Sequence, residues 1–283
     1  MQRIGIIGAG TMGNGIAHVC ARSGFTVVLC DISQPALDQS LLTVATNLAR
    51  EVAKSRLTQE QADAAHARIT PTTSLESLSD CGLVIEAATE KFGIKSQLFR
   101  DLDRILPEAS ILASNTSSIS ITKLAAVTRR PSQVIGMHFF NPVPVMKLVE
   151  IIRGLQTSQA TFDAVKALAE QLTKLPVEVN DAAGFVSNRV LMPLINEACH
   201  TVMEGVASPE AIDTIFREGM AHPMGPLTLA DFIGLDVCVD IMRVLAEGLG
   251  SPKYNPCPLL VRMVDVGWLG RKSGKGFYTY PVP

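Results

Sequence analysis

The chain has 283 residues, of which 47% are hydrophobic and 18% are charged, and its formal net charge at pH 7 is −2. This composition fits one large or two ordinary globular domains, and the charge gives no electrostatic basis for binding nucleic acid or an anionic membrane. No apolar run approaches the roughly 18 residues of a membrane span, and no charged-then-apolar leader is seen, so we expect a cytoplasmic protein without membrane or nucleic-acid partners.

The cysteines and histidines do not suggest a metal site. No two cysteines form a CxxC pair, and no histidine lies near one at ligand spacing. We therefore expect free thiols in a reducing compartment, with no disulfide and no bound metal. The cysteines are Cys20, Cys30, Cys81, Cys199, Cys238 and Cys257.

The first elements form a unit that is typical of dinucleotide binding. Residues 4–7 predict a strand, residues 8–13 (GAGTMG) follow as a glycine turn, and residues 14–23 have apolar side chains at helical spacing. Residues 25–30 predict a second strand, which ends in Asp31. A GxGxxG motif alone is weak evidence, because it also occurs in turns without a ligand. Here strand, turn, helix, strand and acid occur together, which favours a nucleotide site.

Each part of this unit has a physical role. Gly8 permits the tight turn, Gly10 lets a pyrophosphate approach the backbone, and Gly13 lets the helix pack closely on the sheet. The helix N-terminus offers N–H groups to the pyrophosphate. Asp31, roughly 20 residues further on, would bind the ribose hydroxyls and repel a 2′-phosphate, which favours NAD over NADP. The expected cofactor contacts here are Gly8, Ala9, Gly10, Thr11, Met12, Gly13 and Asp31.

Residues 34–68 are polar and predict a helical arm, in which Lys54 either contacts a substrate phosphate or simply faces solvent. Residues 83–88 form a continuous apolar run, as expected for a parallel strand that is covered on both faces. Glu90 and Lys95 lie at or just past the C-terminal end of this strand, the edge at which open α/β sheets bind ligands.

The next strand, residues 111–113, runs into the polar cluster 114–118. One interpretation is an N-cap, by Ser118 or Ser120, for a helix that begins near residue 121. The other is that Ser117 points toward a ligand at the same sheet edge. The two interpretations are compatible.

Residues 134–138 predict a strand that ends on His138, and the Asn-Pro-Val-Pro turn at 141–144 then leaves the sheet. The extended segment 146–152 carries Glu150, so His138 and Glu150 are a candidate acid–base pair. An isolated histidine here would more often be structural. Strand ends bearing glycine turn, acid, serine and histidine all fall on one edge, and this favours the functional interpretation.

Residues 177–179 predict the last strand, after which the pattern becomes helical. We place the domain boundary after Gly184, giving an N-terminal domain of residues 1–184 and an all-α domain of residues 185–283. The tail 269–278 is basic and glycine-rich and predicts a loop. An apolar helix face would form either an internal core or a homodimer interface. Its residues are Val190, Leu191, Leu194 and Ile195.

Seven motifs make the chain resemble the short-chain L-3-hydroxyacyl-CoA dehydrogenases, in particular their bacterial 3-hydroxybutyryl-CoA branch. The resemblance runs from Ile4 to Tyr280. It implies an α/β fold, with an N-terminal Rossmann-type, doubly wound, mostly parallel sheet and a C-terminal all-α domain. The motifs are GAGTMG (8–13), ATE (88–90), SNTSS (114–118), GMHFFNPVPVMKLVE (136–150), GFVSNR (184–189), HPMGPL (222–227) and GRKSGKGFY (270–278).

The resemblance also implies roles for the matched positions. His138 matches the catalytic histidine and Glu150 its carboxylate partner. Ser117 and Asn188 match residues that contact the substrate oxygens, and Ser117 also falls where the acyl-CoA is held. Lys54 matches a contact to a coenzyme A phosphate. Positions around the nicotinamide half and the phosphates of NAD are matched by Glu90, Lys95, Asn141 and Lys272.

The function implied is reversible, NAD-dependent oxidation of a short-chain (S)-3-hydroxyacyl-CoA, such as 3-hydroxybutanoyl-CoA, in fatty-acid or butanoate metabolism. One departure concerns the arm, where Asn47 stands at a position that we expect to be serine in some relatives. Two alternatives remain open at this point. One is a dehydrogenase of a free hydroxy acid or sugar acid that uses the same His138–Glu150 pair, and the other is a dinucleotide-binding structural protein with a relic site.

Overall fold

The chain folds into two units that divide between Asp181 and Ala182. The computed structural model describes residues 2–281, and each unit has its own hydrophobic core. Within these residues, no helix is both long and apolar enough to cross a membrane. The predicted fold class is confirmed: the first unit contains a mostly parallel sheet with helices, and the second is helical.

The first unit is built on one sheet with the strand order β3-β2-β1-β4-β5-β6-β7-β8 in the described residues. Neighbouring strands run parallel except β6 and β7, which are antiparallel. The strands are β1 (Arg3–Ile7), β2 (Thr26–Cys30), β3 (Ile69–Thr72), β4 (Leu83–Glu86), β5 (Ile111–Ser114), β6 (Val134–Phe139), β7 (Leu148–Arg153) and β8 (Leu175–Asn180).

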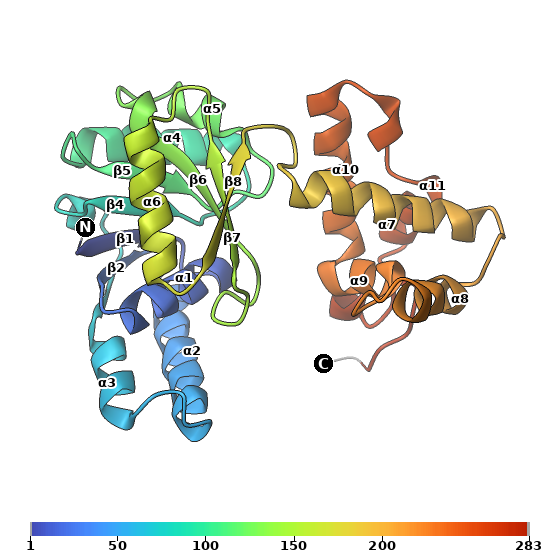
Figure 1. Cartoon of the computed structure of the whole chain (residues 1–283), viewed down its shortest axis with the longest axis horizontal. Helices are drawn as coiled ribbons and strands as arrows, with labels where there is room; N and C mark the ends of the chain where they lie inside the picture. Colours follow the sequence, from blue (N-terminus) through green and yellow to red (C-terminus); the bar gives the residue numbers. More distant parts are fainter. Residues whose placement is uncertain (1, 282–283) are drawn as a thin grey trace. The chain divides into compact units, whose positions relative to one another are not determined.

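The central strands are largely apolar, with polar side chains near their C-terminal ends, because helices exclude water from the sheet. Helix α6 packs against β6, β7 and β8, and α1 packs against β1 and β2, while α2 and α3 form a paired helical arm (Figure 1). The helices of this unit are α1 (Thr11–Arg22), α2 (Gln34–Ala53), α3 (Gln59–Ala67), α4 (Phe92–Ile105), α5 (Ile121–Ala125) and α6 (Gln159–Gln171), with 3₁₀ turns at Leu75–Leu78 and Pro131–Gln133.

Several boundaries differ from the sequence prediction. Helix α1 begins at Thr11, inside the glycine motif, so the turn and the helix share residues. The predicted arm 34–68 is interrupted after Ala53, and the next strand, β3, was missed by the sequence analysis. β3 carries Pro71, which is tolerated because β3 is the edge strand of the sheet.

The second unit packs its helices around a separate core, and in Figure 1 α10 crosses α7, with which it is in contact. The apolar face predicted on α7 is divided: Ile195 is only 1% exposed and belongs to this internal core, whereas Val190 is 67% exposed. The helices are α7 (Ser187–Met203), α8 (Pro209–Thr214), a π-helical turn (Ile215–Gly219), α9 (Pro226–Ile233), α10 (Leu235–Leu249), α11 (Pro258–Asp265) and 3₁₀ turns at Pro252–Tyr254 and Arg271–Ser273.

The basic tail is an ordered loop, because two buried carboxylates hold it. Asp231 accepts hydrogen bonds from the backbone N–H groups of Phe277 (2.9 Å) and Tyr278 (3.0 Å). Asp213 accepts one from the Tyr278 hydroxyl (2.8 Å). A Cβ at Gly276 would lie 1.9 Å from Asp231 Oδ1, so only glycine allows this approach.

A buried histidine joins α1 to the arm. The His18 side chain is inaccessible to solvent, and its Nε2 lies 3.1 Å from Glu51 Oε1 on α2, while Arg22 Nη1 donates to Glu51 Oε2 (2.9 Å). Burial lowers the pKa of His18, an effect that Glu51 only partly offsets. The folded protein therefore resists protonating this ring.

We expect His18 to make the protein less stable in mild acid. The unfolded chain takes up a proton near pH 6.5 but the folded chain does so only at lower pH, so this contribution is present above pH ~6.5 and is lost below it. The difference in thermal midpoint between pH 7.5 and pH 5.5 should be smaller in His18→Leu than in wild type. His200→Leu is the control, and an unchanged pH difference in His18→Leu would contradict the prediction.

Candidate active site

The glycine loop has the shape that a pyrophosphate requires. Gly8 has φ of +100°, and a Cβ on it would lie 2.6 Å from the Ala87 carbonyl oxygen. A Cβ at Gly13 would lie 1.8 Å from the Gly8 carbonyl oxygen, so turn and helix touch directly. By contrast, a Cβ at Gly10 would meet no protein atom within 4 Å. Space thus remains beside the N-terminus of α1, where helical N–H groups attract anions.

Asp31 is held beside this loop. The Ala9 N–H donates to Asp31 Oδ2 (2.7 Å), and the Ser33 N–H donates to Oδ1 (2.9 Å). An ionised carboxylate has about four acceptor positions, so both oxygens retain capacity for ribose hydroxyls. Glycine loop and acid therefore fit the adenosine half of a dinucleotide.

His138 and Glu150 lie directly opposite each other on β6 and β7. Directly opposite residues in a sheet project to the same face. His138 Nδ1 lies 2.8 Å from Glu150 Oε2, and the Glu150 side chain is buried. Phe140 lies beside the imidazole, with the ring centroids 4.8 Å apart. A buried carboxylate on one ring nitrogen fixes the tautomer and the orientation of the ring.

The turn between these two strands is held from two sides. On one side, Gly15 of α1 lies under Val143, and a Cβ on Gly15 would approach Val143 Cβ to 2.7 Å. On the other side, buried Lys174 donates to the carbonyl oxygens of Val143 and Met146, the latter at 2.8 Å. Burial, reinforced by Arg22, lowers the pKa of Lys174 to about 8. Lys174 was not identified from the sequence, because its partners are backbone atoms.

A cavity of about 400 Å³ lies beside the glycine loop. It is lined by predicted cofactor residues from distant parts of the chain, Gly10 and Thr11 from the loop and Asn141 from the turn. Asn47 of the arm also lines it. The structure therefore brings the glycine motif, the turn and the arm to one cavity.

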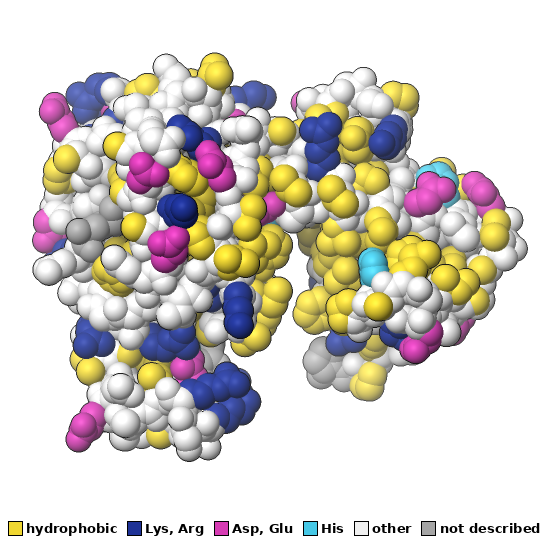
Figure 2. Space-filling model, in the orientation of Figure 1, with side chains coloured by type: hydrophobic (Ala, Val, Ile, Leu, Met, Phe, Trp, Pro, Cys, Tyr) yellow, Lys and Arg dark blue, Asp and Glu magenta, His cyan; other side chains and the backbone are white. Residues whose placement is uncertain are grey.

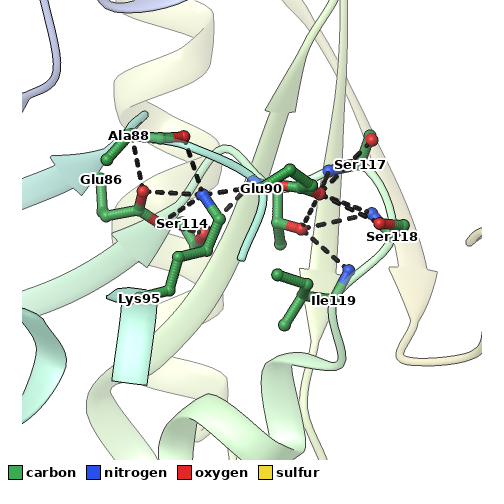
Figure 3. A network of polar contacts seen from close by, with 9 residues as sticks. Glu86, Ala88, Glu90, Lys95, Ser114, Ser117, Ser118 and Ile119 are labelled. Carbon is green, nitrogen blue, oxygen red and sulfur yellow. Dashed lines mark hydrogen bonds and ion pairs between the residues drawn. The ribbon is translucent and has the colours of Figure 1, made fainter. Parts of the chain in front are cut away.

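Glu90 and Lys95, two further predicted cofactor residues, form an ion triad with Glu86 (Figure 3). Lys95 Nζ lies 2.7 and 2.9 Å from the two carboxylate oxygens of Glu86 and 3.3 Å from Glu90 Oε2. Glu86 is fully buried and Lys95 is 1% exposed. The Lys95 ammonium thus neutralises two carboxylates. Glu86 is a component of the site that was not predicted from the sequence. The signal was a carboxylate at the end of an otherwise apolar strand.

The turn that carries Ser117 depends on Glu90. Glu90 Oε1 accepts the N–H groups of Ser117 (2.9 Å) and Ser118 (3.2 Å), and Thr116 Oγ1 also donates to it. Burial alone would raise the pKa of Glu90, but Lys95 and these hydrogen bonds outweigh it and hold this pKa below its ordinary value. Ser120, as one of the two predicted candidates, caps α5 by accepting the Lys123 N–H (3.2 Å).

The remaining predicted residues lie on the arm and in the second unit. Lys54 is exposed just after α2, and Figure 2 shows Lys and Arg side chains gathered over the lower part of the arm. Asn188 is buried in the first turn of α7. Lys272 lies in the tail, where its Nζ is 2.6 Å from Asp236 Oδ2.

The cysteines are free and buried throughout the described chain. Burial raises the pKa of Cys20 to about 12 and that of Cys30 to about 11, so these thiols stay protonated and unreactive. Among residues 2–281, no three His, Cys, Asp or Glu side chains are grouped to hold a metal ion.

Comparison with known proteins matches both units to one family. Residues 3–182 match the family model of the 3-hydroxyacyl-CoA dehydrogenase NAD binding domain, and residues 184–280 match that of the C-terminal domain. A 3-hydroxybutyryl-CoA dehydrogenase of Bradyrhizobium diazoefficiens is 53% identical over 287 aligned positions, covering 100% of this chain and 98% of the relative. The crystal structure of (S)-3-hydroxybutyryl-CoA dehydrogenase from Ralstonia eutropha is 53% identical, with a TM-score of 0.97 over 99% of both chains.

The position of Asp31 predicts the cofactor preference. Replacing Asp31 with Ser should raise the ratio of NADPH to NADH use by at least about tenfold, because a carboxylate that repels the 2′-phosphate is removed. Steady-state kinetics with both cofactors measures the ratio. Asp38→Ser, on the exposed surface of α2, is the control. An unchanged ratio in Asp31→Ser would remove Asp31 from the ribose site.

Proposed function

The chain belongs to the 3-hydroxyacyl-CoA dehydrogenase family, and we propose that it catalyses reversible NAD-dependent oxidation of short-chain (S)-3-hydroxyacyl-CoA to 3-ketoacyl-CoA. The observation that carries this proposal is the His138–Glu150 pair, which lies on the same sheet edge as the glycine loop. The relatives named 3-hydroxybutyryl-CoA dehydrogenase support 3-hydroxybutanoyl-CoA as the substrate.

In this proposal His138 is the general base. Nδ1 is engaged by Glu150, so Nε2 is the atom that takes the proton from the 3-hydroxyl group. Glu150 stabilises the imidazolium that forms, and positioned proton transfer of this kind contributes roughly 10²–10⁴-fold to the rate. NAD, when bound, supplies the hydride acceptor. In the reverse direction the imidazolium donates to the 3-keto oxygen.

Other residues would hold the two ligands. Asp31 and the glycine loop bind the adenosine half and the pyrophosphate, while Asn141 and Glu90 lie toward the nicotinamide half, because that half extends over the strands beyond β1. Ser117 and Asn188 contact the substrate oxygens, and Lys54 meets a coenzyme A phosphate. Lys95 would act on the cofactor indirectly, by holding Glu90 in the triad. Lys272 is a further candidate contact to the cofactor.

The test is His138→Ala assayed with acetoacetyl-CoA and NADH. Turnover should fall by at least about 100-fold, since both the proton donor and its orienting pair are lost. His200→Ala serves as the matched histidine control. Turnover within tenfold of wild type would contradict the role of His138. Free acetoacetate, assayed in parallel, decides the alternative: comparable kcat/KM for the free acid would favour a free hydroxy-acid dehydrogenase.

We also propose a cytoplasmic homodimer formed through the helical domain. Unpaired thiols suit a reducing compartment, and exposed Val190 and Val206 offer apolar surface for a second subunit. Sedimentation equilibrium should give twice the chain mass of 30.3 kDa, and the double variant Val190→Asp/Val206→Asp should shift the mass toward the monomer. A monomeric wild-type protein would refute the dimer.

A further inference from the structure

Glu86 is a charged group that the proposed chemistry does not use. It ends β4, is fully buried, and both carboxylate oxygens are occupied. Oε1 accepts the Ala88 N–H (2.7 Å) and Lys95 Nζ (2.7 Å), while Oε2 accepts the Ser114 hydroxyl (2.6 Å) and Lys95 Nζ (2.9 Å). Ser114 is the β5 residue that pairs with Glu86 in the sheet. The rigid part of the sheet thus fixes this carboxylate.

Glu86 in turn fixes Lys95. The Lys95 ammonium comes from α4 and lies between Glu86 and Glu90, with a third acceptor at the Ala88 carbonyl oxygen (3.3 Å) (Figure 3). A buried ammonium needs a close counter-charge, and Glu86 supplies the closer of the two. The position of Lys95 is therefore determined mainly by Glu86, at the end of β4, and less by Glu90, which lies nearer the site.

Glu90 is the outer member of the triad, and its side chain is 39% exposed. Lys95 holds one of its oxygens, and the other gathers the N–H groups of Ser117 and Ser118. A continuous path of ion pairs and hydrogen bonds therefore runs from the sheet core to the Ser117 turn. Bidentate charge-assisted bonds at the inner end give this path a defined geometry.

We propose that Glu86 is a positioning residue for the dehydrogenase reaction, acting through Lys95 and Glu90 to fix the turn that presents Ser117. The proposal rests on the function proposed above for the Ser117 turn. Without the Glu86 charge, the Lys95 ammonium is drawn toward Glu90, its remaining counter-charge. The carboxylate that holds the Ser117 and Ser118 amides then shifts, and displacements of about 1 Å near a reacting centre can cost 100-fold in rate.

Glu86→Gln tests this role while preserving volume. We expect kcat with acetoacetyl-CoA and NADH to fall by about 10- to 100-fold. The Kd for ADP-ribose, which probes the half of the site that contains Asp31, should stay within about twofold of wild type, because the triad lies on the other side of β1. A kcat within about twofold of wild type would overturn the proposal.

A double variant tests the route through Glu90. Glu86→Gln introduced into Glu90→Gln should lower kcat by less than about threefold further, since the link that Glu86 acts through is already broken. If the two losses instead multiply, Glu86 does not act through Glu90. Ser114→Ala removes one hydrogen bond from Glu86 and should lower kcat in the same direction by a smaller factor. If Glu86→Gln does not fold, Ser114→Ala still tests the role of Glu86, and an unchanged kcat in Ser114→Ala would then overturn the proposal.

The matched control is Asp103→Asn. Asp103 is also a buried carboxylate and lies on α4 with Lys95. Its carboxylate pairs with Arg129 (2.9 Å) and Arg130 (2.8 Å), which are not members of the triad. This variant should lose thermal stability and keep kcat. A loss of kcat in Asp103→Asn equal to that in Glu86→Gln would show that any buried carboxylate matters alike, and would overturn the positioning role.

A measurement independent of turnover separates this inference from the proposed function. Hydrogen–deuterium exchange followed by mass spectrometry should show faster exchange in the peptide covering residues 114–120 in Glu86→Gln, and no change there in Asp103→Asn. Absence of wild-type activity on acetoacetyl-CoA would refute the proposed function and leave this readout intact. Unchanged exchange in Glu86→Gln would refute the positioning role even in an active enzyme.

Discussion

The geometry of the site depends on one reversal of strand direction. The sheet is parallel up to β6, and a parallel return needs a crossover of a dozen or more residues. The antiparallel pairing of β6 and β7 brings Glu150 back directly opposite His138 after a short turn. Because paired residues share a face, the register alone places the carboxylate on the imidazole. A shift of one residue would send Glu150 to the other face of the sheet.

The same turn joins the histidine to the cofactor loop. Val143, in the middle of the turn, packs on Gly15 of α1, whose N-terminus is the glycine motif. On the other side, the Lys174 ammonium donates hydrogen bonds to backbone carbonyl oxygens of the turn. Two glycines of this region therefore leave room for different partners: Gly10, the N-cap of α1, leaves room for a ligand, and Gly15 leaves room for the turn. A shift of α1 would move both parts of the site together.

The sequence predicts what depends on local spacing. The glycine turn, Asp31 and the His138–Glu150 pair lie within single supersecondary units, so motif and strand order sufficed to relate them. Lys174 and Glu86 were missed, because their partners are backbone carbonyls or side chains that only the folded chain brings near. The direction of Ile195 was left open for a similar reason: an apolar helix face does not reveal whether its partner is the same chain or another one.

The ion triad is a costly arrangement if stability is its only purpose. Moving an ion out of water costs several kcal/mol even after relaxation, and replacing a buried ion pair by apolar side chains of equal volume is often neutral or stabilising. Glu86 and Lys95 are buried at the sheet edge, where apolar side chains of similar volume would avoid that cost. Apolar contacts are not directional, so packed apolar side chains can shift relative to each other at little cost. A bidentate carboxylate–ammonium contact does not tolerate such shifts. The buried charges make best sense as a device that transfers the rigidity of the β-sheet to a polar turn.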